Sequence, residues 1–436
     1  MIPDRKGRSG QMSADTTVAR HKEPSGLLIG GIAAGLAGVM ADLLSPLYAT
    51  SFHRGFGLSN TQAGFLVTAA LGMMGVVELT LAHSIGHRNL KRVATYGIVI
   101  ASVALIYISD VSDSGFWSLL VGMIALGLGC GLSFVAGNAA LSFATNSQRA
   151  FGLLTTWYMI FVFVMMSTNP FLRQIYPIVL PYAAMVAVQV VCLVLIWWKL
   201  PDTRVIAAQR TAAARAVQQR DPRVGAELNR DAPQLNLFGP LPLLLGLAVT
   251  LSQFAVAGLW TFAQDLGTTA GLSAEATASF LGLSQLVGLL GTMAPWLLGR
   301  WVGRGALGAA GLLLAGIGIL LVPLVHSPTA YIVGNLAINL GYWVTLPLSL
   351  SVAADLDRNS GRLVAFMLGM SSIGLALGPS LAGPLLGGAD TTLGGWVFGL
   401  IGLAAVPLII APARAADRAT RARRDEEAAE STAGLL

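Results

Sequence analysis

Residues 177–198 read PIVLPYAAMVAVQVVCLVLIWW, a stretch without a charged side chain that ends directly before Lys199. As a helix rising 1.5 Å per residue, such a stretch can cross the ~30 Å hydrocarbon core of a bilayer. A strand of a membrane barrel would need only about 10 residues and would alternate polar with apolar side chains. The stretch therefore predicts a membrane-spanning helix.

The same pattern recurs along the chain and predicts twelve spans. They cover residues 26–49, 61–82, 93–109, 116–141, 150–171, 177–198, 241–263, 277–299, 306–325, 328–353, 363–386 and 393–411. Hydrophobic residues make up 55% of the 436 residues and charged residues 11%, against about 25% charged residues in a soluble domain. This composition excludes a water-soluble enzyme and a disordered chain, and it predicts an all-α integral membrane protein.

The basic residues lie almost entirely on one side of the predicted membrane. Of the 27 Lys and Arg residues, only Arg54 and Arg173 fall in connections on the other side. By the positive-inside rule, this asymmetry places both termini and the long middle loop in the cytoplasm of a plasma (inner) membrane protein. It also explains the formal net charge of +6 without a nucleic-acid partner.

The middle loop divides the spans six from six. The predicted parts are a cytoplasmic N-terminal segment (1–25), a six-helix bundle (26–198), a cytoplasmic linker (199–239), a second six-helix bundle (240–411) and a disordered cytoplasmic tail (412–436). The triplets Gly57–Ser59 and Gly271–Ser273 open the second and the eighth span at an offset of 214. A second pair of triplets opens the fifth and eleventh spans at an offset of 213. These offsets indicate a duplicated six-helix unit.

This layout resembles that of the major facilitator superfamily. The sequence Gly57–Gly64 at the start of the second span is typical of that family, and the loops after spans 2 and 8 resemble its G-x-x-x-D-x-x-G-x-[RK] motif. The first copy has Leu79, His83, Gly86 and Arg88 at the motif positions, and the second has Trp296, Arg300, Gly303 and Gly305. Both aspartates are absent, although in the family this acid helps to lock the cytoplasmic side.

The resemblance implies two six-helix bundles around a central cavity, with alternating access between them. Gly378 and Pro379 in span 11 resemble the Gly-Pro motif of the family's antiporters. In the family, however, that motif belongs to span 5, where this chain has Asn169-Pro170. We expect His83, Gly86, Arg88, Arg300, Gly303, Gly378 and Pro379 to act in the conformational change.

Acidic groups at membrane depth are the candidates for energy coupling, because they are costly there. Without a GxxxxGK[ST] phosphate loop, neither ATP nor another cofactor is expected. Asp42 lies ~24 Å from the cytoplasmic end of the first span, where it could exchange a proton, pair with a cationic substrate or be hydrogen-bonded within the bundle. Glu78 is the second candidate, although a salt bridge to Arg88, Lys91 or Arg92 would also suit it.

The substrate site is expected among polar and aromatic residues in the middle of the spans. The candidates are Asn138, Trp157, Tyr158, Gln253, Trp260, Gln285, Asn339, Tyr342 and Trp343. Aromatic rings with a few amides suit a lipophilic solute that is neutral or cationic, while interhelical packing is the alternative interpretation. No Lys or Arg lies well inside a span, which disfavours an anion. His83 and His87 have a metal-binding spacing but lack a third ligand, so no metal is expected.

Together these features predict a proton-coupled secondary transporter that exports a lipophilic neutral or cationic small molecule. Two alternatives stay open. The chain could be a proton-linked uptake carrier for a small neutral or anionic metabolite, or a non-transporting receptor or scaffold built on a carrier fold. No catalytic constellation indicates an enzyme. The expected partners are the substrate, protons and the lipid bilayer, and the protein is expected to be a monomer.

Overall fold

The computed structural model describes residues 25–81, 84–85, 88–110, 115–144, 147–202, 236–357, 362–388 and 390–433. The first half comprises α1 (Ser25–Gly38), α2 (Met40–Leu43), α3 (Ser45–Thr50), the π-helical turn η1 (Ser51–Gly55), α4 (Asn60–Leu81), α5 (Leu90–Asp110), α6 (Gly115–Ser142), α7 (Ser147–Ile175) and α8 (Val179–Lys199). The second half comprises α11 (Pro240–Thr261), α12 (Ala263–Thr269), α13 (Ala274–Val302), α14 (Arg304–Leu324), α15 (Pro328–Leu356), α16 (Arg362–Leu386) and α17 (Thr392–Ala433). Across these described ranges, helices are the only regular secondary structure.

The predicted all-α membrane fold is confirmed. Eleven helices in the described part of the chain are long and apolar enough to cross a membrane, and Gly26–Gly38 adds a shorter apolar helix. The first predicted span is not one helix, because it is divided into α1, α2 and α3. The seventh span is likewise divided, at Phe262 between α11 and α12.

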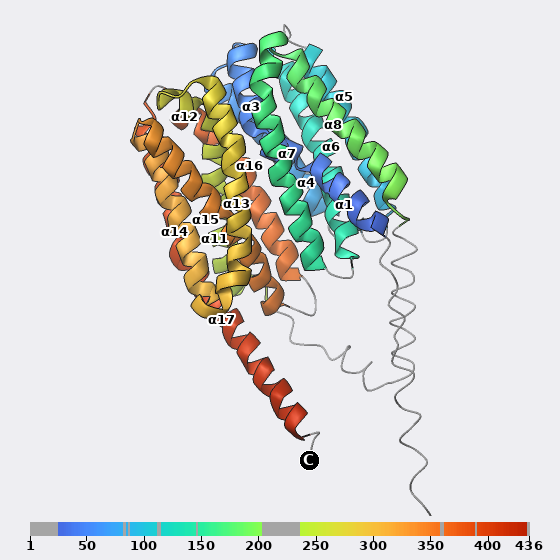
Figure 1. Ribbon diagram of the computed structural model, residues 1–436, viewed down its shortest axis with the longest axis vertical. Coiled ribbons are helices and arrows are strands. Elements are labelled where there is room, and N and C mark those ends of the chain that lie inside the picture. Colours follow the sequence, from blue (N-terminus) through green and yellow to red (C-terminus); the bar gives the residue numbers. More distant parts are fainter. Residues whose placement is uncertain are drawn as a thin grey trace, which may run out of the picture.

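The two halves stand side by side, with their helices running in the same general direction (Figure 1). We call the end where α8 finishes at Lys199 and α11 begins at Pro240 the linker end, and the opposite one the far end. The halves meet mainly where α4 packs on α16 and where α7 packs on α13. Smaller contacts join α3 to α11 and α12.

Glycine allows the helices of the two halves to approach closely. A Cβ atom on Gly64 of α4 would lie 2.3 Å from the carbonyl oxygen of Pro379 on α16. On the other side of α16, a Cβ atom on Gly378 would lie 2.5 Å from the carbonyl oxygen of Phe254 on α11. Small residues let helices gain van der Waals contact in lipid, where apolar burial drives little association. Helix α16 is therefore packed closely against both halves.

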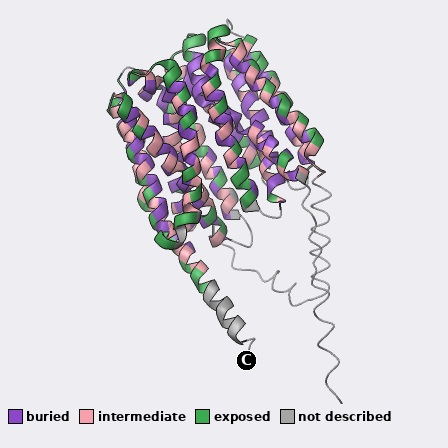
Figure 2. Cartoon of the chain, viewed as in Figure 1, coloured by how far each residue is buried: buried purple, intermediate pink, exposed green. Residues whose placement is uncertain are grey.

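Large apolar side chains cover the outside of the molecule. Trp117, Val103 and Leu400 are each more than half exposed, at 75%, 60% and 55%. Buried residues concentrate where helices face one another, and exposed residues lie on the outward faces (Figure 2). This distribution is opposite to that of a water-soluble helical bundle, and it is what contact with lipid tails requires.

The tail differs from the expectation of disorder. Helix α17 continues without a break through residues 412–433 and projects beyond the linker end (Figure 1). This segment is rich in Ala and carries charges of both signs. Ala has the highest helix propensity, and opposite charges three or four residues apart stabilise a helix. Segment composition alone did not separate a charged helix from a disordered tail.

Candidate functional site

A central cavity lies between the two halves. The space between its lining atoms, together with the open solvent at its mouth, amounts to about 520 Å³. The residues that line it are Asp42, Leu43, Gln253, Val256, Ala257, Leu259, Trp260, Gln285, Asn335, Ile338, Asn339, Tyr342, Trp343 and Leu375. All except Asp42 and Leu43 come from the second half, so the site is asymmetric.

Asp42 lies in the short helix α2, between two breaks of the first span. Pro46, at the start of α3, has no N–H to donate to the carbonyl of residue 42, which a continuous helix would require. Leu44 takes φ −98° and ψ 13°, outside the helical values, and the chain changes course there. The sequence therefore places an acidic side chain at an interruption of the helix.

The Asp42 carboxylate is the only charged group among the described residues that line the cavity. It is partly exposed to that cavity. Within the described chain, no hydrogen bond or ion pair joins its side chain to another group. A carboxylate held at membrane depth without a partner attracts a proton or a cation, because either one removes the uncompensated charge.

Helix α15 supplies one complete wall of the cavity. Asn335, Ile338, Asn339, Tyr342 and Trp343 all line it. Their spacings of three and four residues put these side chains on a single face of the helix. The wall therefore combines amide groups with an apolar and aromatic surface, a lining typical of sites for small organic molecules.

A hydrogen bond closes the cavity between the halves at Trp260. Its Nε1–H donates to the carbonyl oxygen of Leu43 at 3.3 Å. That carbonyl is available because the amide of Leu47 donates to Leu44 instead. The break in the first span thus provides the acceptor for a side chain of the seventh span.

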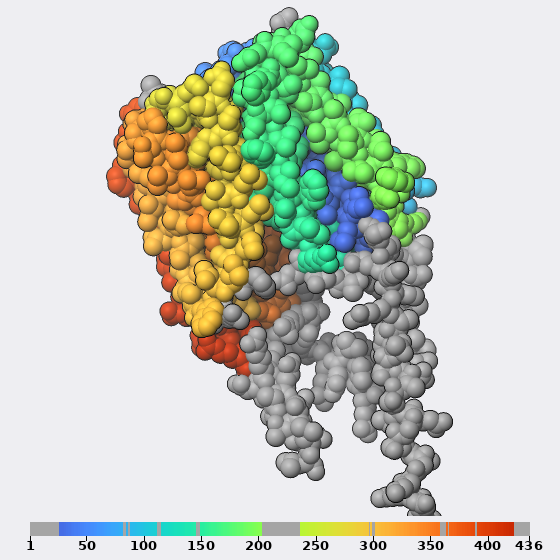
Figure 3. Space-filling model, in the orientation of Figure 1, coloured from blue at the N-terminus to red at the C-terminus, as the bar shows by residue number. Residues whose placement is uncertain are grey.

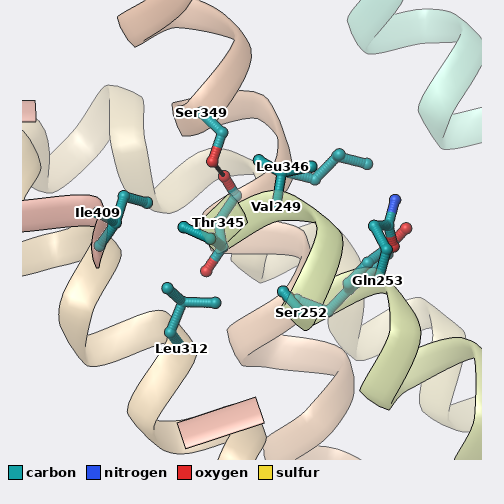
Figure 4. Close-up of a pocket in the computed structure, with 10 residues that line it drawn as sticks. Val249, Ser252, Gln253, Leu312, Thr345, Leu346, Ser349 and Ile409 are labelled. Carbon is teal, nitrogen blue, oxygen red and sulfur yellow. Dashed lines mark hydrogen bonds between the residues drawn. The ribbon is translucent and has the colours of Figure 1, made fainter. Parts of the chain in front are cut away.

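A smaller side cavity adjoins the central one within the second half. Gln253 and Tyr342 line both cavities. In the side cavity, Thr345 and Ser349 of α15 lie across from Leu312 and Ile409 (Figure 4). The Ser349 hydroxyl donates to the carbonyl oxygen of Thr345 at 2.8 Å. Gln253 therefore forms part of the wall between two spaces.

The far end of the molecule is closed by polar contacts between the halves. The Thr50 hydroxyl donates to Gln264 Oε1 at 2.6 Å, and Asn60 Nδ2 donates to the carbonyl oxygen of Gly387. Arg54 pairs with Asp265, with 3.4 Å between Nη2 and Oδ1. Burial raises the pKa of Asp265, while the positive charge of Arg54 opposes that rise.

The halves separate toward the linker end. A Cβ atom on Gly288 of α13 would lie 3.1 Å from the methyl carbon of Met159 on α7. Beyond that level, a Cβ atom on Gly152 would meet no other helix within 4 Å, and Leu290 is 63% exposed. In the space-filling view, the two helices touch near the far end and diverge below it (Figure 3). The central cavity therefore opens toward the linker end.

Glu78 occupies a different environment from Asp42. It does not line the central cavity. It accepts a hydrogen bond of 2.6 Å from the Ser372 hydroxyl, which joins α4 to α16 across the interface between the halves. Glu78 and Asp42 interact electrostatically, and both interact with Tyr158. The predicted salt bridge to Arg88, Lys91 or Arg92 is not found among the described ion pairs.

The structure brings six of the predicted binding residues into the cavity and leaves three outside it. Gln253, Trp260, Gln285, Asn339, Tyr342 and Trp343 line it. Asn138 instead donates to the carbonyl oxygen of Phe134 within its own helix, and Trp157 is 48% exposed. Tyr158 is buried, and its hydroxyl has no hydrogen-bond partner.

Asn335 is the main residue that the sequence analysis missed. It lies four residues before Asn339, and this i, i+4 spacing was the available signal. The described residues contain no group of three or more His, Cys, Asp or Glu side chains that could hold a metal ion. His83 and His87 lie outside the described residues.

The sequence profile of the Major Facilitator Superfamily matches residues 30–379. The chain belongs to the major facilitator superfamily. It is therefore a multi-pass membrane transporter and not an enzyme. No curated protein matches the chain. Among solved structures, the crystal structure of a mutant of the peptide transporter POT is similar, with 16% sequence identity and a TM-score of 0.63. The match covers 91% of this chain and 95% of that one, and it shows a common fold.

The superfamily motif after the eighth span is altered but still lies beside acidic groups. Gly303 has φ +78°, which favours glycine, and it precedes the first residue of α14, Arg304. Arg304 pairs with Asp355 of α15 and, at 3.4 Å, with Asp417 of α17. Acids from two other helices thus meet Arg304, which directly precedes Gly305 at the last position of the motif, although the motif's own aspartate is absent.

The remaining motif residues have varied positions. His83 and Gly86 fall outside the described residues. Arg88 is exposed, and the side chain of Arg300 is not described, although its backbone belongs to α13. Gly378 and Pro379 pack α16 closely against α11 and α4. Pro379 therefore lies at the contact between the halves, and Gly378 lies at a helix contact within the second half.

Proposed function

We propose that this member of the superfamily is a proton-coupled secondary transporter and that Asp42 is its principal proton site. The observation that carries the proposal is the Asp42 carboxylate in the cavity between the two halves. It has no described hydrogen-bond or ion-pair partner, and it is the only charged group among the described lining residues. The charged carboxylate is destabilised when water is excluded from the cavity, and protonation removes that charge. The proton and the substrate therefore compete for one carboxylate, which couples their movements.

We propose Glu78 as a second proton site that acts on the contact between the halves. As a carboxylate it accepts the hydrogen bond from Ser372, and protonation weakens that charge-assisted bond. Glu78 and Asp42 interact electrostatically, as do both with Tyr158. A proton on one carboxylate therefore changes the affinity of the other for its own proton.

We further propose that the substrate is a lipophilic small molecule, neutral or cationic, and that the direction is export. The aromatic and amide lining of the cavity supports the first part. The absence of a basic residue among the described lining residues argues against the alternative of an anionic metabolite. In this proposal both termini are cytoplasmic, the protein resides as a monomer in the plasma (inner) membrane, and the cavity opens to the cytoplasm.

The test is ethidium accumulation in cells that overproduce the wild type, Asp42→Asn or Asp390→Asn. Asp390 is a fully exposed aspartate outside the cavity, so the control makes the same chemical change. We expect the wild type and Asp390→Asn to lower accumulation, a protonophore to abolish that effect, and Asp42→Asn to lack it. Equal accumulation with and without the protein would contradict a broad export of cations, and a wild-type effect that survives the protonophore would contradict proton coupling.

A further inference from the structure

The polar groups around the cavity donate their hydrogen bonds to the protein itself. Asn339 Nδ2 donates to the carbonyl oxygen of Asn335 at 3.0 Å and to Ser284 Oγ at 3.3 Å, which uses both of its N–H groups. Asn335 Nδ2 donates to the carbonyl oxygen of Tyr331 at 2.9 Å. The indole N–H of Trp260 donates to Leu43. Three side chains of the lining thus donate hydrogen bonds to other groups of the protein.

The identity of these partners fixes the orientation of the two asparagine amides. A backbone carbonyl oxygen can only accept a hydrogen bond. The NH₂ groups of Asn335 and Asn339 must therefore face the carbonyls of Tyr331 and Asn335, and their Oδ1 atoms must point elsewhere. An exchanged amide would put two acceptors in contact. No described group donates to either Oδ1 atom.

Gln253 adds another free acceptor. Its Nε2 donates to Ser371 Oγ at 2.6 Å. Its Oε1 is buried without a hydrogen-bond partner, and Gln253 itself is only 5% exposed. A buried amide oxygen without a donor is destabilising unless water or a ligand supplies one. Because Gln253 lines the central cavity, a ligand there can supply that donor.

The described hydrogen bonds therefore leave several acceptors of the cavity lining without a donor, and the negative charge of Asp42 lies among them. Asp42 contributes a carboxylate, and Gln253, Asn335 and Asn339 contribute amide oxygens. The lining also holds uncharged donors that no described bond engages, on Gln285, Tyr342, the Trp343 indole and the second N–H of Asn335. Trp260, Tyr342 and Trp343 supply ring surfaces beside these acceptors.

We infer that the substrate is an organic amine that carries N–H groups, a primary or secondary ammonium attached to an apolar or aromatic body. Its charge pairs with Asp42, its N–H groups donate to the free amide oxygens, and its body packs on the rings. A quaternary ammonium has the charge and the body but no N–H, so it leaves the acceptors buried and unpaired. A carboxylate is repelled by the like charge of Asp42, and no basic residue among the described lining offsets that repulsion.

This inference rests on the proposed function for its site, but its test needs no proton gradient. The purified full-length protein in detergent is titrated at one fixed pH with three probes, and binding is followed by tryptophan fluorescence and calorimetry. The probes are 2-phenylethylamine, N,N,N-trimethyl-2-phenylethylammonium and 3-phenylpropanoate. The first two share the ring and the charge and differ in N–H groups, and the third carries the opposite charge.

We expect 2-phenylethylamine to bind at least about tenfold more tightly than its trimethyl analogue, and 3-phenylpropanoate not to bind. Equal or tighter binding of the trimethyl compound overturns the inference, as does failure of the primary amine to bind at millimolar concentrations. If binding follows the expectation and gradient-driven transport fails, the proposed function is wrong while the inference stands. If gradient-driven transport is found but the binding preference is absent, the inference is wrong while the proposed function stands.

Two variants locate the preference. Asn339→Leu removes an acceptor of the cavity and should reduce the preference for the primary amine at least threefold. Asn138→Leu is the matched control, since Asn138 also donates to a carbonyl four residues earlier, at 2.9 Å, but lies outside the cavity. If Asn339→Leu does not fold, Gln253→Met tests the same point with a side chain of similar length. An unchanged preference in the folded variant contradicts the assignment.

Discussion

Asp42 and Glu78 are both acidic residues of the first half at membrane depth, but the structure gives them opposite surroundings. Asp42 lies at a helix break, faces the cavity and has no described hydrogen-bond or ion-pair partner. Glu78 lies within the continuous helix α4 and is hydrogen-bonded to Ser372 of the other half. The difference teaches that depth alone does not define the role of a carboxylate. Without a partner, a carboxylate is free to bind a proton or a substrate. With a hydrogen-bond donor from the other half, it holds the two halves together.

The largest effect is expected from Asp42→Asn. Loss of one member of a buried charge pair costs on the order of 2–5 kcal/mol, so affinity for a cationic amine should fall by about 30-fold or more. The main part of the pH dependence of transport should disappear at the same time, because Asn does not titrate, and only the smaller contribution of Glu78 should remain. Transport into proteoliposomes at several pH values measures both effects.

Asp390→Asn, at an exposed position of the second half, is the control and should behave as the wild type. Wild-type pH dependence in Asp42→Asn would reverse the comparison and make Glu78 the principal site.

Pro46→Ala tests whether the helix break matters. Alanine restores the missing N–H, so the first span can continue through Asp42 and turn the carboxylate away from its present direction. Coupled transport should fall by about tenfold, an effect of ~1.4 kcal/mol, while the folded protein is retained. Hydrogen exchange at residues 40–46 should slow in the variant.

Pro181→Ala, at the first turn of α8, provides a matched control, since proline is tolerated there without a break. Equal loss of transport in both variants would show that the break has no specific role.

Glu78→Gln should have a smaller effect than Asp42→Asn. Glutamine can still accept the hydrogen bond from Ser372 but cannot take up a proton. We expect substrate affinity within about twofold of the wild type and a shift in the pH dependence of transport, because the electrostatic influence on Asp42 is removed. The profile of rate against pH measures the shift.

Ser372→Ala separates the bond from the charge. It leaves Glu78 titratable and should weaken the contact between halves by about 1–2 kcal/mol. Complete loss of coupling in Glu78→Gln, with coupling retained in Asp42→Asn, would invert the proposed order of the two sites.

The smallest effect is expected at a third acidic group, Asp265 at the far end. Burial raises its pKa above the ordinary value, so it takes up a proton at a higher pH than an exposed aspartate does. As the pH falls through that raised value, protonation removes a charge that burial disfavours by more than Arg54 favours it, so the closed far end is stabilised relative to an open form that hydrates Asp265. The change should be at most ~1 kcal/mol, because Arg54 is 41% exposed.

Spin labels at the exposed Ser59 and Ala274, with Cys130 and Cys192 replaced by Ala, measure this opening as a distance. The mean distance should decrease at acidic pH, and Asp265→Asn should remove its pH dependence. A pH response that persists in Asp265→Asn would assign the effect to another group, with Glu78 the next to test.

Most of the fold could be predicted from the sequence because two strong physical signals coincide. Apolar length defined the spans, and the distribution of Lys and Arg ordered the connections. The break of the first span was less accessible, although Pro46 was its visible cause. The helical tail was missed because charge and low hydrophobicity are shared by disordered segments and exposed helices.

The candidate site was predictable mainly where polar residues stand out in apolar helices. Gln253, Gln285 and Asn339 did so, and all three line the cavity. Asn138 and Trp157 met the same criterion and lie elsewhere, because a helix that is apolar on all sides does not reveal which face is turned inward. The free acceptors could not be predicted at all, since they depend on which partner each amide finds.

The hydrogen bond between Trp260 and the Leu43 carbonyl has a consequence for the hydration of the transport cycle. When the far end opens, the two halves separate at this contact, and a bare carbonyl is left at membrane depth. Water must replace the indole N–H, because an unpaired carbonyl there is destabilising. Each opening of the far end therefore carries solvent into the cavity, so osmolytes too large to enter should slow turnover by favouring the closed form.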